Sequence, residues 1–237
     1  MGANKENKIN VKNIIKESAV VLVLVAIIIV FSFLSPQFFK VSNFITILRQ
    51  ISILAIVSVG MTVVLISGGI DLSVGSIISV VSVLTAMSAV YGKLPTGVAI
   101  VIGLLLGTLM GLINGVMITM TGMPPMIGTL ATQMIFRGLG FIVCDGASVY
   151  HLPEGFKIFG QGYVGPIPVP VLIMVIILAI FAFILGRTYI GRYFYAVGSN
   201  AEATRLCGLN TQKIQILAYM LCGFLSAIGG IIMTSRV

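Results

Sequence analysis

The residue of this chain best placed for chemistry is Asp71, an acid within a short polar segment between two apolar runs. Residues 68–76 read Gly-Gly-Ile-Asp-Leu-Ser-Val-Gly-Ser, and the flanking runs are long enough to cross a bilayer. An aspartate at the centre of a membrane helix costs about 2.5–3.5 kcal/mol on insertion scales, so it requires a polar partner or water. Glycines beside such an acid predict an interrupted helix, and interrupted helices form the sites and pathways of transporters. The segment therefore predicts a transport function.

Two roles for this segment are open, and they are compatible with each other. In the first, two glycines end one helix and an acid or serine caps the next by accepting hydrogen bonds from its backbone N–H groups. In the second, the segment lies in the permeation path or gate, because capped half-helix ends beside a cavity form transporter sites. The residues concerned are Gly68, Gly69, Asp71, Ser73 and Gly75.

No group of residues in the sequence predicts catalysis, a cofactor or a metal. The only histidine, His151, has no second histidine near it, and the three cysteines lack the spacing of a metal site or a disulfide framework. A phosphate-binding loop of the G-x-x-x-x-G-K-[ST] kind is also absent from the sequence. We therefore expect a protein that is not an enzyme and uses no cofactor.

The composition is that of an integral membrane protein. Hydrophobic residues make up 58% of the chain and charged residues 8%, and the mean hydropathy is +1.16. Such a chain carries far less charge than a water-soluble surface needs. The apolar runs are continuous rather than alternating, which predicts helices. The net charge of +8 comes from bases that flank the apolar runs, so it indicates orientation in membrane lipid rather than binding to nucleic acid.

We expect an all-α, polytopic transmembrane helix bundle with about seven spans, broken near 68–76. Residues 1–17 are polar and are predicted to form a cytoplasmic N-terminal tail, whereas 18–237 form the transmembrane domain. The spans are predicted at 19–31, 51–67, 74–90, 97–119, 125–143, 170–186 and from 214 onward.

Two loops between the spans differ in charge. The loop 187–213 is net positive and the loop 144–169 is slightly negative, so the positive-inside rule places 187–213 in the cytoplasm and 144–169 outside. Residues 36–50 are predicted to be interfacial, with Ser42 as the N-cap of a short helix that ends near Gln50.

Three basic residues depart from this charge pattern. Lys40 and Arg49 fall on the outer side, where we expect them to reach back to the membrane surface. Arg137 lies inside the predicted span 125–143, where a charge is costly. We expect it to face the bundle interior, with Asp145 as a candidate partner.

One predicted span carries glycines at a spacing of four residues. This spacing places Gly103, Gly107, Gly111 and Gly115 on a single helix face, where another backbone can approach closely. We interpret the face as a helix-packing surface, with the neighbouring Asn114 as an interhelical hydrogen-bond partner.

A short helix is predicted within the loop 187–213. Asn200 is a suitable N-cap, residues 201–206 favour helix, and Gly208 is a natural stop. With glycines on both sides and small residues along it, this helix could seat in a groove of a partner protein. The alternative is a solvated turn without a partner.

The segment 68–76 resembles the signature of permease subunits of ribose-type ABC importers. Residues 191–192, 198–200, 203–205 and 207–210 resemble the cytoplasmic coupling loop of that family, and Tyr219, Cys222 and Gly223 extend the match. The resemblance implies a homodimeric permease in the bacterial cytoplasmic membrane, with a cytoplasmic ATPase and an extracytoplasmic sugar-binding protein as partners. It implies that the substrate is a monosaccharide, best matched by ribose. It also implies that the ATPase docks on Gly198, Asn200, Glu202, Ala203, Thr204, Arg205 and Gly208.

The chain departs from the family pattern at its C-terminal side. Members of the family have about ten spans, so the final spans would be absent from this sequence. One alternative to the importer is therefore a non-transporting fragment that assembles with a complete permease. Another is a channel or an ion-coupled carrier, for which Asp71 is the only carboxylate at membrane depth.

Overall fold

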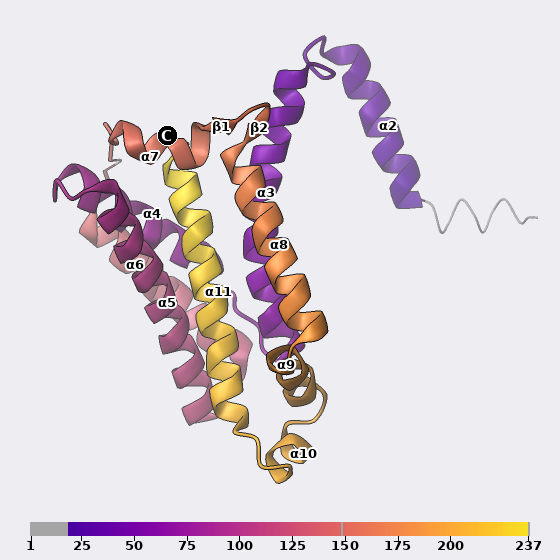
Figure 1. The fold of residues 1–237 in the computed structure, drawn as a ribbon, viewed down its shortest axis with the longest axis vertical. Coiled ribbons are helices and arrows are strands. Elements are labelled where there is room, and N and C mark those ends of the chain that lie inside the picture. The colour runs from indigo at the N-terminus through magenta and orange to yellow at the C-terminus, as the bar shows by residue number, and fades with distance from the viewer. Residues whose placement is uncertain (1–18, 148, 237) are drawn as a thin grey trace, which may run out of the picture. The chain divides into compact units, whose positions relative to one another are not determined.

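The computed structural model of the chain describes residues 19–147 and 149–236. These residues are mostly helical, which confirms the all-α expectation (Figure 1). The predicted tail 1–17 lies outside the described residues. The helices are α2 (Ala19–Leu34), α3 (Val41–Ile66), α4 (Val74–Val90), α5 (Thr96–Thr121), α6 (Pro125–Val143), α7 (Glu154–Gln161), α8 (Val169–Arg187), α9 (Tyr189–Ser199), α10 (Ala201–Leu206) and α11 (Thr211–Thr234). One antiparallel hairpin, β1 (Tyr163–Val164) and β2 (Ile167–Pro168), lies between α7 and α8.

Five of these helices are long and apolar enough to cross a membrane, rather than the seven expected. They are α3, α5, α6, α8 and α11. The remaining two predicted spans coincide with α2 and α4, which are apolar but shorter. A helix needs about 20 residues to cross the hydrocarbon core alone, and α4 has 17.

The chain divides into two compact units, residues 1–47 and 48–237. In the first unit, the turn after α2 is held by the Asn43 amide, which donates to the Phe38 carbonyl at 2.9 Å. The expectation of a short interfacial helix ending near Gln50 is wrong, and so is Ser42 as its N-cap. Helix α3 begins at Val41 and continues to Ile66. The reason is that no glycine or proline interrupts the sequence between Val41 and Val59, so nothing ends the helix at Gln50.

Helix α11 is the centre of the second unit. It packs mainly against α5 and α4, and it is the most buried of the five long apolar helices. The glycines of α5 lie along this contact. A Cβ on Gly107 would lie 2.5 Å from the Cβ of Ala227, and one on Gly115 would lie 2.9 Å from the Cα of Ile216. A Cβ on Gly111 would overlap the Tyr219 carbonyl oxygen, so the two backbones approach too closely for any side chain there.

The first glycine of that stripe faces a different helix. A Cβ on Gly103 would overlap the hydroxyl of Thr85, which belongs to α4. The stripe therefore packs α5 against α4 at its start and against α11 along the rest of its length.

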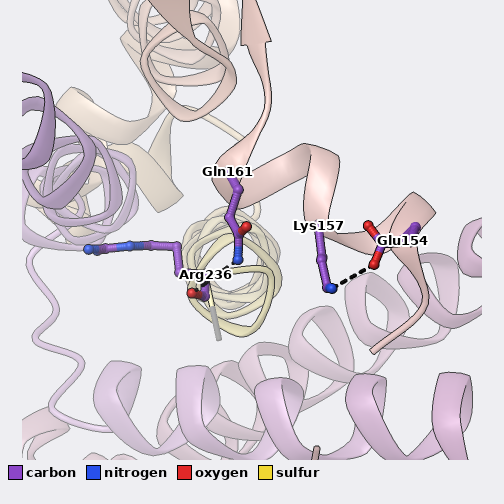
Figure 2. A network of polar contacts seen from close by, with 4 residues as sticks. All are labelled: Glu154, Lys157, Gln161 and Arg236. Carbon is purple, nitrogen blue, oxygen red and sulfur yellow. Dashed lines mark hydrogen bonds and ion pairs between the residues drawn. The ribbon is translucent and has the colours of Figure 1, made fainter. Parts of the chain in front are cut away.

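The two loops of opposite charge lie at opposite ends of the second unit. Helix α7 and the hairpin lie where α11 ends, and α9 and α10 lie where α11 begins (Figure 1). Figure 2 shows the contacts at the first of these ends. The Gln161 amide donates to the Arg236 carbonyl at 3.4 Å, and Lys157 forms an ion pair with Glu154 at 2.7 Å.

Arg49 also belongs to this end of the unit. Its guanidinium donates to the Gln161 carbonyl at 3.1 Å and lies 4.7 Å from the ring centroid of Tyr163. A carbonyl and an aromatic face are both favourable partners for a cation. The loop 144–169 therefore provides partners for Arg49, one of the bases that depart from the positive-inside pattern.

Candidate functional site

The end of α3 forms the first part of the candidate site. Gly68 has φ = 84°, and its N–H donates to the Leu65 carbonyl at 3.0 Å. The Gly69 N–H donates to the Val64 carbonyl at 2.9 Å. These two bonds form a Schellman motif, in which the left-handed position favours glycine. The two glycines therefore end α3 in the way that the sequence predicts.

Asp71 lies just before α4 and bonds to Ser73, the N-cap residue of that helix; no described side chain accepts a cap hydrogen bond from the first turn of α4, so the expected cap is not formed. The Asp71 Oδ1 accepts hydrogen bonds from the Ser73 N–H at 2.9 Å and the Ser73 hydroxyl at 2.6 Å. The Asn114 amide of α5 donates to the same carboxylate oxygen at 3.4 Å and to the Ser73 hydroxyl at 2.7 Å. The start of α4 is thus joined to α5 by a buried polar cluster, which we call the Asp71 cluster: Asp71, Ser73 and Asn114.

The backbone between α3 and α4 is held by side chains from two further helices. The Ile70 carbonyl accepts from the Tyr219 hydroxyl of α11 at 3.4 Å and from the Thr129 hydroxyl of α6 at 3.3 Å. The Tyr219 hydroxyl fits beside residue 69 only because this residue is a glycine. A Cβ there would lie 2.5 Å from the hydroxyl oxygen. Residues 67–73 are therefore bonded to α5, α6 and α11. No local pattern in the sequence indicates that Thr129 and Tyr219 bind the Ile70 carbonyl, because both lie far from it in the chain.

The predicted path residues differ in exposure. Asp71 and Ser73 are fully buried at 0% exposure, Gly69 is buried, and Gly68 and Gly75 are exposed. Two oxygen atoms of the cluster, Asp71 Oδ2 and Asn114 Oδ1, are buried without a hydrogen-bond partner among the described residues. In the single chain, the carboxyl group thus packs between helices.

The second part of the site is the segment around α10. The Asn200 side chain accepts from the Ala203 N–H at 2.9 Å, which is the N-cap that the sequence predicts. The Thr204 hydroxyl is buried and donates to the Ala196 carbonyl at 2.9 Å, so it fixes α10 against α9. Gly208 has φ = 85° where α10 has ended.

The outer surface of α10 is open to solvent. Leu206 is 79% exposed, and Ala203, Glu202 and Arg205 are exposed beside it. Glu202 and Arg205 form an ion pair at 2.7 Å, and this hydrogen bond raises the pKa of the Arg205 guanidinium above its usual value. A groove of about 450 Å³ between α10 and α11 is lined by Arg205, Gly208, Leu209, Asn210, Thr211 and Gln212.

The two parts of the site touch through glycines 130 positions apart. A Cβ on Gly68 would lie 3.7 Å from the Cα of Gly198, and one on Gly198 would overlap the Ile66 carbonyl oxygen. The last turn of α9 therefore packs directly on the end of α3, with no side chain between the backbones. The sequence contains both motifs but does not show that they meet.

Other candidate residues lie apart from this site. Arg137 is exposed on α6, so the expectation that it faces the bundle interior is wrong, and Asp145 forms no ion pair with it. Its place on the helix explains this, because the interior side of α6 is occupied by small and apolar residues such as Gly140 and Phe136. Among the described residues, no group of three or more His, Cys, Asp or Glu side chains could hold a metal ion.

Comparison with known proteins gives a consistent result. The chain is 40% identical over 240 residues to the ribose import permease protein RbsC of Haemophilus influenzae, covering 100% of this chain and 74% of the relative. It is 38% identical to RbsC of Bacillus subtilis, covering 98% and 72%, and 34% identical to the D-allose transport system permease protein AlsC of Escherichia coli, covering 90% and 66%. No solved structure matches the chain. Residues 43–237 match the family described as branched-chain amino acid transport system / permease component, and the chain belongs to this family.

Proposed function

We propose that the chain is the transmembrane permease subunit of an ATP-binding-cassette importer that moves a monosaccharide across the bacterial cytoplasmic membrane. Ribose is the substrate best supported, because the relatives named ribose import permeases are 38–40% identical. Relatives named for D-allose and autoinducer 2 are 33–34% identical. These names favour an importer over a non-transporting fragment or an ion-coupled carrier.

The observation that carries this proposal is the contact between Gly198 and the end of α3. An importer of this class needs a mechanical connection between the surface where an ATPase binds and the helices that enclose the substrate. Here the exposed α10 is fixed to α9 by Thr204, and α9 rests on the Ile66 and Gly68 backbone. Packed backbones transmit a displacement because they cannot interpenetrate.

The same connection extends to the helices of the bundle. The segment 67–73 is bonded to α5 through Asn114, to α6 through Thr129 and to α11 through Tyr219. A movement of α9 against the end of α3 would therefore shift the segment 67–73, and with it the positions of α5, α6 and α11 relative to one another. In this mechanism Asp71 and Ser73 hold the joint together, while the exposed Gly68 and Gly75 lie on the side nearer the translocation path.

The charges of the loops support one orientation in the membrane. The segment with α9 and α10 carries Arg187, Arg192, Arg205 and Lys213 and is assigned to the cytoplasm. With α2 and α4 added to the five long apolar helices, the chain crosses about seven times from a cytoplasmic N-terminus. In this proposal α4 and the segment before it form one broken span.

Three partners follow from this orientation. The ATPase docks on α10 and the flanking residues from Gly198 to Gly208, and it hydrolyses ATP, so the permease itself is not an enzyme. An extracytoplasmic sugar-binding protein docks at the end formed by α7 and the hairpin. A second copy of the permease completes the assembly.

The docking assignment is tested by reversing one charge at each end of the unit. Glu202 and Glu154 are each in an ion pair at 2.7 Å with a base three residues later. Glu202→Arg and Glu154→Arg therefore break equivalent surface pairs. We expect Glu202→Arg to lower the amount of cognate ATPase that co-purifies with the permease, and Glu154→Arg to leave it unchanged. An equal ratio of ATPase to permease in both variants would refute docking on α10.

The source of energy is tested separately in vesicles. We expect uptake of labelled ribose only with internal ATP, the ATPase and the binding protein. Uptake driven by a proton or sodium gradient without ATP would instead support an ion-coupled carrier.

A further inference from the structure

Arg137 lies on an exposed side of α6, next to the face that packs in the described bundle. The buried residues of α6, which include Phe136 and Gly140, lie on an adjoining side that packs against α4 and α5. Arg137 is about 100° around the helix from Phe136. Arg137 itself is exposed, and no hydrogen bond or ion pair joins its guanidinium to a described residue. A permanently charged side chain thus stands on the open surface of a helix that is long and apolar enough to span a membrane.

The position along α6 makes contact with lipid unfavourable. Arg137 lies 12 residues after Pro125 and six before Val143, which is about 18 Å and 9 Å along the helix axis. Side chains of a helix lean toward its N-terminus, so Arg137 leans away from the nearer end and toward the middle of the span. Charged residues at such depth face water-filled cavities or charged partners.

A dry contact with a second copy does not suit this residue. The sequence has six acidic residues, and of these only Asp71 lies between predicted spans at membrane depth, where it is fully buried. A second copy presents the same surfaces and therefore, among its described residues, no further exposed acid at this depth, and if α6 lay on the two-fold axis, two like charges would meet. Two guanidinium groups are tolerated across a water-filled space but not in a dry interface.

A second polar residue accompanies Arg137. Gln133 precedes it by four residues, so the two side chains lie on the same face of α6, and Gln133 is partly exposed. Guanidinium N–H groups are donors only, while the glutamine amide both donates and accepts. Together they can hydrogen-bond a molecule rich in hydroxyl groups without requiring it to be charged.

We propose that the α6 face carrying Gln133 and Arg137 lines a water-filled sugar passage, and that both side chains hydrogen-bond the hydroxyl groups of the sugar as it passes. This inference rests on the proposed import function and assigns residues to the passage. The passage runs between α6 and the facing wall of a second copy.

The first test measures which side of α6 meets water. Single cysteines replace Arg137, Ile135 or Leu139 in a background where Cys144, Cys207 and Cys222 are alanine, and each variant is treated with a membrane-impermeant thiosulfonate. Ile135 and Leu139 are 58% and 51% exposed, and each lies about 160° around the helix from Arg137. One is deeper and the other shallower, so they control for depth.

We expect Arg137→Cys to react at least about tenfold faster than both controls, because a thiol facing lipid does not ionise. A rate equal to that of the controls would overturn the inference. A gradient of rates in which Leu139→Cys reacts fastest would also overturn it, since this result indicates only distance from the surface.

The second test measures uptake at matched membrane abundance. We expect Arg137→Leu to lower ribose uptake about tenfold, Arg137→Lys to lower it less, and Leu139→Ile to leave it unchanged. Normal uptake by Arg137→Leu would refute the sugar contact. If the parent protein shows no ATP-driven sugar uptake, the proposed function fails; if the parent transports but Arg137→Cys is unreactive, only this inference fails.

Discussion

A methyl group added at Gly198 tests the connection between the docking segment and the helix end. In Gly198→Ala the new Cβ would overlap the Ile66 carbonyl oxygen and lie 2.9 Å from the Ile66 carbonyl carbon and 3.3 Å from the Gly68 nitrogen. All three atoms are backbone, so no side chain can rotate away. Helix α9 must shift by about 1 Å or more, and overpacking of this kind costs about 1–3 kcal/mol.

The expected result is loss of coupling as well as of stability. We expect the purified variant to melt at a lower temperature and to move less ribose per ATP hydrolysed, because the shifted α9 no longer rests on the end of α3. Gly186→Ala is the matched control. Gly186 is also a helical glycine, it belongs to the preceding helix α8, and a Cβ there would meet nothing within 4 Å.

The decisive measurement is the ratio of sugar transported to ATP hydrolysed in proteoliposomes that hold permease, ATPase and binding protein. If Gly198→Ala melts and transports like Gly186→Ala, the contact carries no motion and the proposed mechanism is wrong. A lower melting temperature with an unchanged ratio would show that the contact is structural only.

Two further predictions concern the buried joints. Asp71→Leu removes the acceptor of the Ser73 N–H and hydroxyl and of the Asn114 amide. Each buried donor left unpaired costs about 1–3 kcal/mol, so the melting temperature and ribose uptake should both fall. Asp71→Asn keeps an acceptor oxygen and should lower both less; equal melting temperatures of the two variants would contradict the role of Asp71 as the shared acceptor of Ser73 and Asn114. Gly111→Ala places a Cβ on the Tyr219 carbonyl oxygen, and we expect a loss of about 1–3 kcal/mol in unfolding free energy. Gly138→Ala, with nothing within 4 Å, should be neutral or stabilising, and a similar denaturation midpoint for both would show that α5 and α11 can separate at no cost.

Local signals in the sequence predicted the ends of the helices at the site. The left-handed Gly68 and the cap formed by Asn200 depend on residues within a few positions, so their types were sufficient. The partner of Asn114 was not predictable, because it depends on packing that brings Asp71 to α5 across 43 positions. The contact of Gly198 with α3 was missed for the same reason.

Charge was a less reliable guide than local geometry. The expected interior position of Arg137 followed from the cost of burying a charge in lipid, but a single chain does not contain every surface that can satisfy that charge. Arg49 shows the opposite case. Its partners, the Gln161 carbonyl and the Tyr163 ring, lie more than a hundred residues away, in a loop that the sequence shows only to be slightly negative.

The shortness of α4 has a consequence for how the protein meets its membrane. With 17 residues α4 is about 26 Å long, while α3 and α5, with 26 residues each, are about 39 Å long. The segment 67–73 before α4 is non-helical, and its Ile70 carbonyl accepts from hydroxyl groups of α6 and α11. In a thicker bilayer this segment would extend, whereas a continuous helix would change its tilt. In a thinner bilayer the segment would shorten. Lipid chain length would then affect the transport rate through the non-helical segment 67–73, which is bonded to α5, α6 and α11.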